Sequence, residues 1–412
     1  MVKAKSIFLN MKKPDIFFRK LINRLPSGIK RWLLRFESKA KISRDLSKIA
    51  EMYKGKMVFI FPFPNCPWGY MFQRPQQLAR AIARKGYPVF YVVDTSFPHA
   101  PDWYIRGVQE IEKGLYLYND GLASTILMNQ LNSFDLVVVW QYWPHQLQFV
   151  NRLSEHCPIF KIYDCIDHLT TFDQYAKIST DYVSSIESSD LALATSNTIF
   201  REIKSIHQNV MLVPNGVCVE DFIPTKNMNS FDINHFKKNY KYIVGYYGAV
   251  AEWFDFKLIS YLAEKNNDCL FLFVGELYLQ VEKRARELQQ ECSNVVFMPR
   301  VNYTQIPMLL SQFDIAILPF VINDITLSTS PVKVFEYLAG GKPFISTDLP
   351  EVRQINVEYV ATSPEEFHIK LRNFAENSES EQNRDYRIDI AKKHSWDEKT
   401  MNVLNRIKMV RG

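Results

Sequence analysis

Apolar runs alternate with amphipathic stretches along most of the chain from residue 57 onward. The run MVFIFPF starts at Met57, and RPQQLARAIARKG follows it with proline at an early helical position and glycine at its end. The apolar run PVFYVVD then completes a strand–helix–strand unit over residues 57–94. Short apolar runs that are separated by helical stretches predict parallel strands with helices on both faces of the sheet.

A polar stretch separates two series of these units. Residues 223–241 lack a strong apolar period and indicate a linker. Further strands are predicted at 135–140, 159–165, 191–196 and 210–216 before the linker and at 242–248, 269–275, 294–299, 314–320 and 343–347 after it. The pattern therefore predicts an α/β protein with two doubly wound, Rossmann-like domains.

This organisation divides the chain into four predicted parts. They are a basic N-terminal extension at 1–50, Rossmann-like domains at 51–225 and 240–378, and a helical C-terminal segment at 379–412. Ligands of open parallel sheets bind beyond the carboxyl ends of the strands. Two such domains that face each other across a cleft would therefore hold a ligand between them.

The bulk composition of the 412 residues is that of a globular protein. Apolar residues make up 47% and charged residues 23%, which argues against a disordered or fibrous chain. No run approaches the roughly 18 apolar residues of a membrane-spanning helix, and no secretory signal peptide is visible. The six cysteines contain no Cys-x-x-Cys pair, which favours a reduced, cytoplasmic protein over a disulfide framework or a zinc site.

The net charge of +6 hides an excess of positive charge near the N-terminus. Residues 1–45 hold thirteen Lys and Arg against Asp15, Glu37 and Asp45, so this segment carries +10 and the remainder carries −4 (6 − 10). Within it, IFFRKLINRLPSGIKRWLLRF mixes apolar and basic residues at near-helical spacing. Such a segment suits an amphipathic helix on an anionic membrane surface. A helix docked on the protein itself or a solvated tail also fits, whereas no motif points to nucleic acid.

Candidate chemistry lies in residues 328–347, whose sequence is STSPVKVFEYLAGGKPFIST. A helix is predicted here, with Ser330 as its N-cap and Pro331 in its first turn. The free amides of such a helix start attract anions at the carboxyl edge of a sheet, and Lys333 adds a positive charge. Glu336 lies one turn further and can accept hydrogen bonds from vicinal hydroxyls such as those of a ribose. Alternatively, Lys333 and Glu336 form a surface ion pair that contributes little.

Several stretches together resemble glycosyltransferases with the GT-B fold, which consists of two Rossmann-like domains. More narrowly, they resemble the retaining family-4-type enzymes of bacterial surface polysaccharide synthesis, including teichuronic acid transferases. SPVKVFEYLAGGKPFIST is similar to their nucleotide-binding helix, and VGYYGAVAEWFDFKLI is similar to the opening of their second domain. Further similar stretches, in the family's order, are WGYMFQRPQQLARAIARKGYPVFYV, YDCIDHLTTF, DLALATSNTIF and VPNGVCVEDF. HSWDEKTMNVL is similar to their closing helix, which returns towards the N-terminal domain.

The resemblance implies that the second domain binds a nucleotide-sugar donor and that the first binds the acceptor. Glu336 would bind the nucleotide ribose, while Lys333 and the helix-start amides would hold the diphosphate. The donor-binding residues predicted for this stretch are Ser328, Thr329, Ser330, Val332, Lys333 and Glu336. The chain departs from the family pattern at Ser328, where a second glutamate that contacts the donor sugar is expected.

Further donor-site candidates follow other strands of the second domain. Gly248 would allow a diphosphate to approach the backbone closely, although a simple turn also explains it. The family's basic residue after this glycine is absent, and Trp253 lies in the stretch that replaces it. Arg300 could supply the missing charge, or it is a plain surface arginine. The remaining candidates are Gly275, which could instead serve packing, and Met298 and Tyr303, which could flank a nucleotide base or belong to the core.

The candidates of the first domain also lie near predicted strand ends. Gly69 lies in the first strand-to-helix loop, and Arg74 at the helix start could clamp a phosphate or an acidic acceptor. Asp164, like the nearby Asp167, could orient an acceptor hydroxyl or cap the next helix. His145 is the best-placed histidine for catalysis. The structural alternatives are a surface charge for Arg74 and a structural role for His145, and no residue cluster supports a metal site.

The resemblance implies a metal-independent hexosyltransferase that retains the anomeric configuration. It would move a sugar from a nucleoside-diphosphate sugar to a lipid-linked glycan during synthesis of a capsule, lipopolysaccharide or similar surface polysaccharide. Lys333, Arg300, Asp164 and His145 are the predicted catalytic residues. No cofactor is expected, and the enzyme would lie peripherally on the cytoplasmic face of the membrane. The alternatives are a GT-B nucleotide-sugar epimerase and a non-catalytic binding protein in an assembly complex, which Ser328 supports best.

Overall fold

The computed structural model describes most of the chain beyond the basic extension. The described residues are 38–63, 68–69, 72–93, 105–120, 124–168, 175–223, 233, 236, 238–377 and 379–411. Most of the predicted extension at 1–50, and most of the predicted linker at 223–241, therefore lie outside the described residues. None of the helices in these ranges is long and apolar enough to cross a membrane.

An eight-stranded sheet forms the first part of the described structure, in the order β3-β4-β2-β1-β5-β6-β7-β8. Strands β3 and β4 pair antiparallel, whereas the other pairings observed in this sheet are parallel. The apolar pattern did not predict this hairpin. The strands are β1 (Met57–Phe61), β2 (Val89–Val92), β3 (Gly107–Glu112), β4 (Leu115–Asn119), β5 (Leu136–Gln141), β6 (Ile159–Cys165), β7 (Leu191–Ala194) and β8 (Val210–Leu212). Its helices are α4 (Lys39–Met52), α5 (Arg74–Arg84), α6 (Thr125–Met128), α7 (Leu147–His156), α8 (Tyr175–Glu187) and α9 (Asn197–Ile206).

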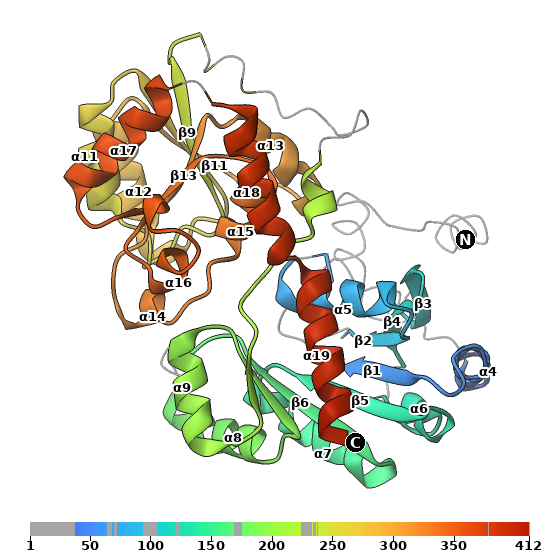
Figure 1. The fold of residues 1–412 in the computed structure, drawn as a ribbon. Helices are drawn as coiled ribbons and strands as arrows, with labels where there is room; N and C mark the ends of the chain where they lie inside the picture. The colour runs from blue at the N-terminus through green and yellow to red at the C-terminus, as the bar shows by residue number, and fades with distance from the viewer. Residues whose placement is uncertain are drawn as a thin grey trace, which may run out of the picture. The chain divides into compact units, whose positions relative to one another are not determined.

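A second, parallel sheet of six strands follows, in the order β11-β10-β9-β12-β13-β14. Its strands are β9 (Tyr242–Tyr247), β10 (Cys269–Val274), β11 (Val295–Met298), β12 (Ile315–Leu318), β13 (Phe344–Thr347) and β14 (Val360–Ala361). The helices that follow β9 along the chain are α11 (Phe256–Lys265), α12 (Leu279–Glu291), α13 (Ile306–Gln312), α14 (Asp324–Leu327), α15 (Val332–Ala339), α16 (Pro350–Arg353), α17 (Pro364–Glu376), α18 (Glu381–Lys393) and α19 (Trp396–Arg411). Figure 1 shows strands and helices alternating in both sheets. The predicted α/β class with two Rossmann-like sheets is confirmed.

The chain divides into two compact units, which are described separately below. The first unit holds residues 1–164 and 188–190, and the second unit holds residues 165–187 and 191–412. Strand β8 is the last strand of the first sheet in the sequence and β9 is the first strand of the second sheet. The predicted linker lies between these two strands in the sequence. The predicted domain bounds at 225, 240 and 378 stay predictions.

Helix α4 belongs to the core of the first unit, although it falls within the predicted extension. Ser38 caps the helix by accepting a hydrogen bond from the Lys41 amide. Ile42 and Leu46 are 1% exposed and join the same apolar cluster as Val58 of β1. For residues 39–50, the structure therefore supports docking on the protein's own surface, which was one of the alternatives for the basic segment.

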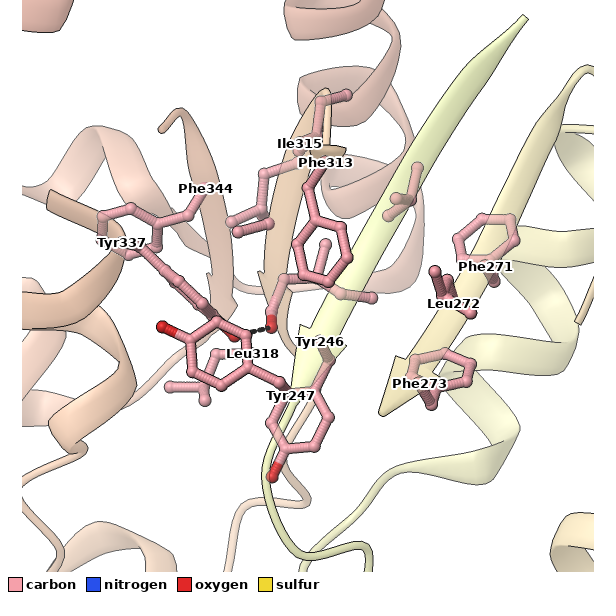
Figure 2. Packing of buried hydrophobic residues seen from close by; sticks show 14 of the residues in the cluster. Tyr246, Tyr247, Phe271, Leu272, Phe273, Phe313, Ile315, Leu318, Tyr337 and Phe344 are labelled. Carbon is pink, nitrogen blue, oxygen red and sulfur yellow. Dashed lines mark hydrogen bonds between the residues drawn. The ribbon is translucent and has the colours of Figure 1, made fainter. Parts of the chain in front are cut away.

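The core of the second unit is centred on β9 and its neighbours β10 and β12. Figure 2 shows aromatic side chains of these strands packed with those of α15, among them Tyr247 and Tyr337. Gly245 lies in the middle of β9 beneath the ring of Phe313. A Cβ atom at residue 245 would lie only 2.3 Å from that ring, so no larger residue fits without repacking.

We predict that Gly245→Ala lowers the free energy of unfolding by about 1–3 kcal/mol, because the added methyl overlaps the Phe313 ring. Urea unfolding followed by circular dichroism measures the change. The double variant Gly245→Ala/Phe313→Leu should lose less free energy of unfolding than the two single variants lose together, because leucine makes room for the methyl group. Strict additivity would show that the two side chains do not compete for this space.

Candidate functional site

Helix α15 begins one residue later than the sequence predicted. Pro331 is its N-cap residue, with extended φ and ψ of −74° and 112°, and Val332 is its first helical residue. Ser330 is therefore not the N-cap, which corrects the prediction. The helix follows β12 and α14, so its start lies at the carboxyl edge of the second sheet, where first-turn amides have no partner within the helix.

Ser330 instead anchors the start of α15 to a distant segment of the second unit. Its Oγ accepts a hydrogen bond from the Asn215 amide at 3.0 Å, and its carbonyl accepts one from Asn215 Nδ2 at 2.7 Å. Both side chains are buried. The two bonds fix the backbone ahead of α15 to the chain that follows β8.

The hydroxyls of Ser328 and Thr329 donate to backbone carbonyls of α14. Ser328 Oγ lies 2.9 Å from both the Asp324 and the Ile325 carbonyl oxygens, and Thr329 Oγ1 lies 2.8 Å from the Ile325 oxygen. Ser328 is 3% exposed. These two side chains cap the end of α14, and their predicted contacts with the donor stay predictions.

Lys333 and Glu336 form an ion pair in which the carboxylate is buried. Lys333 Nζ lies 3.3 Å from Glu336 Oε2, and the two side chains are 27% and 4% exposed. Glu336 Oε2 has no hydrogen-bond partner among the described residues. The pair is thus not the solvent-exposed surface pair that was the alternative, because a buried carboxylate with unused acceptor capacity is costly unless a ligand completes it.

Tyr247, which the sequence did not single out, lies directly beside this pair at the end of β9. The Lys333 ammonium is 5.2 Å from the centre of its ring, a cation–π distance. Its hydroxyl is buried close to the Glu336 carboxylate, although the two groups do not reach the geometry of a full hydrogen bond. Burial and the nearby Glu336 carboxylate raise the pKa of Tyr247 well above its usual value, so the hydroxyl stays protonated and can donate.

Gly248 and Gly275 bring two backbone segments together next to Lys333. A Cβ atom on Gly275 would lie 1.7 Å from the Gly248 carbonyl oxygen, so only glycine allows this approach. Gly248 has a φ of +141°, and a Cβ atom there would lie 3.2 Å from Lys333 Cε. Gly275 therefore serves packing, which was its alternative role, whereas Gly248 borders the Lys333 side chain itself.

The other candidates of the second unit lie at or just after strand ends. Trp253 is half-buried, with its ring 5.9 Å from that of Tyr278 in an edge-to-face contact. Met298 ends β11 and packs against the apolar core, and Arg300 is exposed two residues further. The Tyr303 hydroxyl donates to Asp221 Oδ2 at 3.1 Å. The predicted contacts of these four residues with a base or diphosphate stay predictions.

Arg74 and Asp164 of the first unit form a buried ion pair. Arg74 Nε donates to Asp164 Oδ2 and Arg74 Nη2 donates to Asp164 Oδ1, each at 2.9 Å. Trp140 Nε1 also donates to Asp164 Oδ2 at 2.9 Å, and the two charged side chains are only 2% and 0% exposed. The guanidinium and the carboxylate therefore form a buried pair that is held by two hydrogen bonds. The clamp predicted for Arg74 and the catalytic role predicted for Asp164 stay predictions.

His145 and Gly69 remain accessible in the first unit. His145 is exposed on a short 3-10 helix, Pro144–Gln146, that follows β5. Gly69 is exposed and has a φ of +78°, a left-handed conformation that favours glycine. Within the described ranges, no group of three or more His, Cys, Asp or Glu side chains is arranged to hold a metal ion.

Part of the second unit matches a known protein family. Residues 244–377, which hold β9 to α17 and the Lys333–Glu336 pair, match the family "Glycosyl transferases group 1". The chain is 25% identical over 254 residues to a Bacillus subtilis (strain 168) protein named for teichuronic acid biosynthesis, the glycosyltransferase TuaH. That match covers 57% of this chain and 63% of the relative, so the chain spans less than two thirds of the relative's length.

Solved structures share the fold at low sequence identity. Sucrose-phosphate synthase from Thermosynechococcus elongatus superposes with a TM-score of 0.63 and 13% identity, covering 87% of this chain and 100% of that one. HepE from Anabaena, in complex with UDP and glucose, superposes with a TM-score of 0.58 and 15% identity, covering 86% and 99%. The predicted GT-B fold and the predicted resemblance to group 1 glycosyltransferases are thereby confirmed.

We predict that Arg74→Met lowers the free energy of unfolding of the first unit by about 3–5 kcal/mol, because it leaves the buried Asp164 carboxylate without its cation. Chemical denaturation monitored by tryptophan fluorescence measures the loss. A matched control is Arg353→Met, whose arginine pairs with Asp348 but is 45% exposed. The control should change stability by no more than about 0.5 kcal/mol. Equal effects of the two variants would contradict the structural role of the buried pair.

Proposed function

Since the chain has the GT-B fold and residues 244–377 form a group 1 glycosyl transferase domain, we propose that it is an active glycosyltransferase. It moves a sugar from a nucleoside-diphosphate sugar to a glycan acceptor. The observation that carries this proposal is the buried Glu336 carboxylate, paired with Lys333 at the start of α15 and short of hydrogen-bond partners. HepE, whose structures hold UDP and UDP-glucose, supports a uridine diphosphate donor.

In this proposal, the start of α15 binds the nucleotide-sugar donor. First-turn amides and the Lys333 ammonium direct positive charge at the diphosphate, while Glu336 accepts hydrogen bonds from the ribose hydroxyls. Negative charge grows on the diphosphate as the bond from the anomeric carbon to the phosphate oxygen breaks. The same positive groups stabilise that charge, which lowers the barrier to departure without requiring a metal ion. The backbones of Val332 and Gly248 border this donor-binding site.

The acceptor is proposed to be a lipid-linked glycan of bacterial surface polysaccharide synthesis, with retention at the anomeric carbon. The name of the Bacillus subtilis relative, which assigns it to teichuronic acid biosynthesis, supports this pathway class. Arg300 and His145, both exposed near strand ends, remain the second candidates for contacts with phosphate and acceptor. The Asp164 carboxylate is buried in its pair with Arg74, so we assign the acceptor contacts to these exposed residues first.

One observation favours a non-catalytic binding protein as the second candidate. Ser328 stands where the family resemblance implies a carboxylate on the donor sugar, and its hydroxyl is bound to α14 carbonyls. A protein that grips the nucleotide but lacks a contact to the sugar would bind donor without turning it over.

We predict that Glu336→Gln weakens binding of the donor by roughly tenfold or more, because an amide accepts ribose hydroxyls less strongly than a carboxylate does. Lys333→Met should lower kcat by about 100-fold or more, because it removes charge that stabilises the leaving diphosphate. Isothermal titration with UDP and turnover assays on a panel of UDP-sugars and glycan acceptors measure the two effects.

The matched control for both variants is Lys370→Met. Lys370 also pairs with a glutamate on its own helix, Glu366 of α17, but it donates to the carbonyl of Val360 in β14. This control should leave donor binding and kcat unchanged. Transfer that survives in both site variants would contradict the assignment. Donor binding without turnover by the wild type would favour the non-catalytic candidate, and an epimerised sugar after incubation with donor alone would identify an epimerase.

We further propose that the basic segment holds the enzyme on an anionic membrane surface at the cytoplasmic face. Residues 1–45 carry +10, and their aromatic and aliphatic residues recur at near-helical spacing. Residues 39–52 form α4 and are built into the core of the first unit. The membrane-binding part is therefore placed within residues 1–37, which lie outside the described residues.

We predict that the full chain sediments with vesicles that contain phosphatidylglycerol and that a chain lacking residues 1–37 does not, because the removed part holds most of the basic excess. The deletion leaves Ser38 in place to cap α4, so the fold should persist. Neutral phosphatidylcholine vesicles are the control. Persistent binding of the shortened chain to anionic vesicles would place the contact elsewhere on the protein.

A further inference from the structure

Tyr247 holds an unused hydroxyl next to the charged pair of the donor site. It ends β9, is 1% exposed, and its hydroxyl lies close to the Glu336 carboxylate without reaching the geometry of a full hydrogen bond. Oε2 of the buried Glu336 is paired with the Lys333 ammonium but also lacks a well-aligned hydrogen bond. Two neighbouring buried polar groups without a well-aligned hydrogen bond are unusual, because each unmade bond costs free energy.

Lys333 explains why this arrangement persists without a ligand. Its ammonium lies 3.3 Å from Glu336 Oε2 and 5.2 Å from the centre of the Tyr247 ring. The lysine thus balances the carboxylate charge and lies over the face of the tyrosine ring. Lys333 is also the most exposed of the three side chains, at 27%, so it is the one able to turn towards a ligand.

A bound diphosphate would compete with Glu336 for this lysine. A diphosphate carries more negative charge than one carboxylate and also contacts the helix-start amides, so it draws the ammonium away. Glu336 would then be a buried carboxylate without its cation, which is among the costliest states of a protein interior. A nearby donor that becomes available at that moment would offset this cost.

We propose that Tyr247 is this donor: a positioning residue whose hydroxyl binds Glu336 when Lys333 turns to the diphosphate of the nucleotide. The tyrosine keeps the carboxylate charged and oriented, so that its remaining lone pairs accept the ribose hydroxyls. Binding of diphosphate and binding of ribose are thereby coupled through a single side chain. This inference rests on the proposed donor site and adds a residue and a sequence of contacts to it.

Tyr337 lies in the same apolar cluster and serves as a comparison for Tyr247. Its ring meets that of Tyr247 edge to face at 5.5 Å, and Figure 2 shows the two together. Its hydroxyl donates to the Ile317 carbonyl at 3.2 Å, so it is already satisfied in the unliganded protein. The two tyrosines therefore share burial and ring packing but differ in whether the hydroxyl has a partner.

The first experiment compares Tyr247→Phe with its matched control, Tyr337→Phe. Isothermal titration with UDP measures affinity, and thermal unfolding of the unliganded full chain measures stability. Tyr247→Phe should weaken UDP binding by roughly tenfold to a hundredfold, the range of a hydrogen bond to a charged group. It should lower the melting temperature little, because the hydroxyl makes no well-aligned hydrogen bond in the unliganded state. Tyr337→Phe should show the reverse, with a melting temperature lower by roughly 2–4 °C and unchanged UDP affinity.

The second experiment removes the lysine and needs no ligand. In a Lys333→Met background, Glu336 has lost its cation, so the Tyr247 hydroxyl should already bind it in the unliganded protein. Tyr247→Phe should then lower the melting temperature by roughly 2–4 °C, although it has no such effect in the presence of Lys333.

The outcomes separate this inference from the proposed function. If the wild type binds UDP, and Tyr247→Phe changes neither UDP affinity nor stability in the Lys333→Met background, the role of Tyr247 is overturned while the donor site stands. If the wild type binds none of UDP, GDP, ADP and TDP, the proposed function fails. The stability difference between the two backgrounds would in that case still support the hydrogen bond from Tyr247 to Glu336, and its absence would overturn it.

Discussion

The buried carboxylate of Glu336 is the constraint on which the second unit's active edge depends. A carboxylate that is only 4% exposed must be balanced by a cation and completed by hydrogen-bond donors. Lys333 supplies the cation from the same helix, and the end of β9 brings Tyr247 beneath the pair. The remaining acceptor capacity is what a nucleotide's ribose would fill. The arrangement costs stability in the unliganded protein, which is the property that the proposed donor site would explain.

The surrounding backbone holds this edge in place. Asn215 forms two hydrogen bonds with Ser330, and these bonds fix the start of α15 to the chain after β8. Gly248 and Gly275 lie so close that a single methyl group would separate the strand ends next to Lys333. The hydroxyls of Ser328 and Thr329 close the turn before the helix. These contacts pre-organise the helix start, so that little ordering cost remains when an anion binds.

Periodicity alone was sufficient to predict most of the architecture, because buried parallel strands are continuous apolar runs. The β3–β4 hairpin was missed, since one of its strands carries charged residues and neither fits a strand–helix–strand unit. The three-residue spacing of Lys333 and Glu336 predicted their pairing, but burial of the carboxylate depends on the whole sheet. The partnership of Arg74 with Asp164 joins residues 90 positions apart, and that of Asn215 with Ser330 joins residues 115 apart. The sequence offered no reason to predict Tyr247 as a site residue, other than its position at the end of a strand.

A crystal structure of the protein with bound UDP tests the central claim most directly. We predict that the ribose hydroxyls bind Glu336, that the diphosphate lies at the first turn of α15, and that Lys333 Nζ has turned from Glu336 to a phosphate oxygen. Nucleotide bound at another place, or bound at α15 with the ribose away from Glu336, would contradict it.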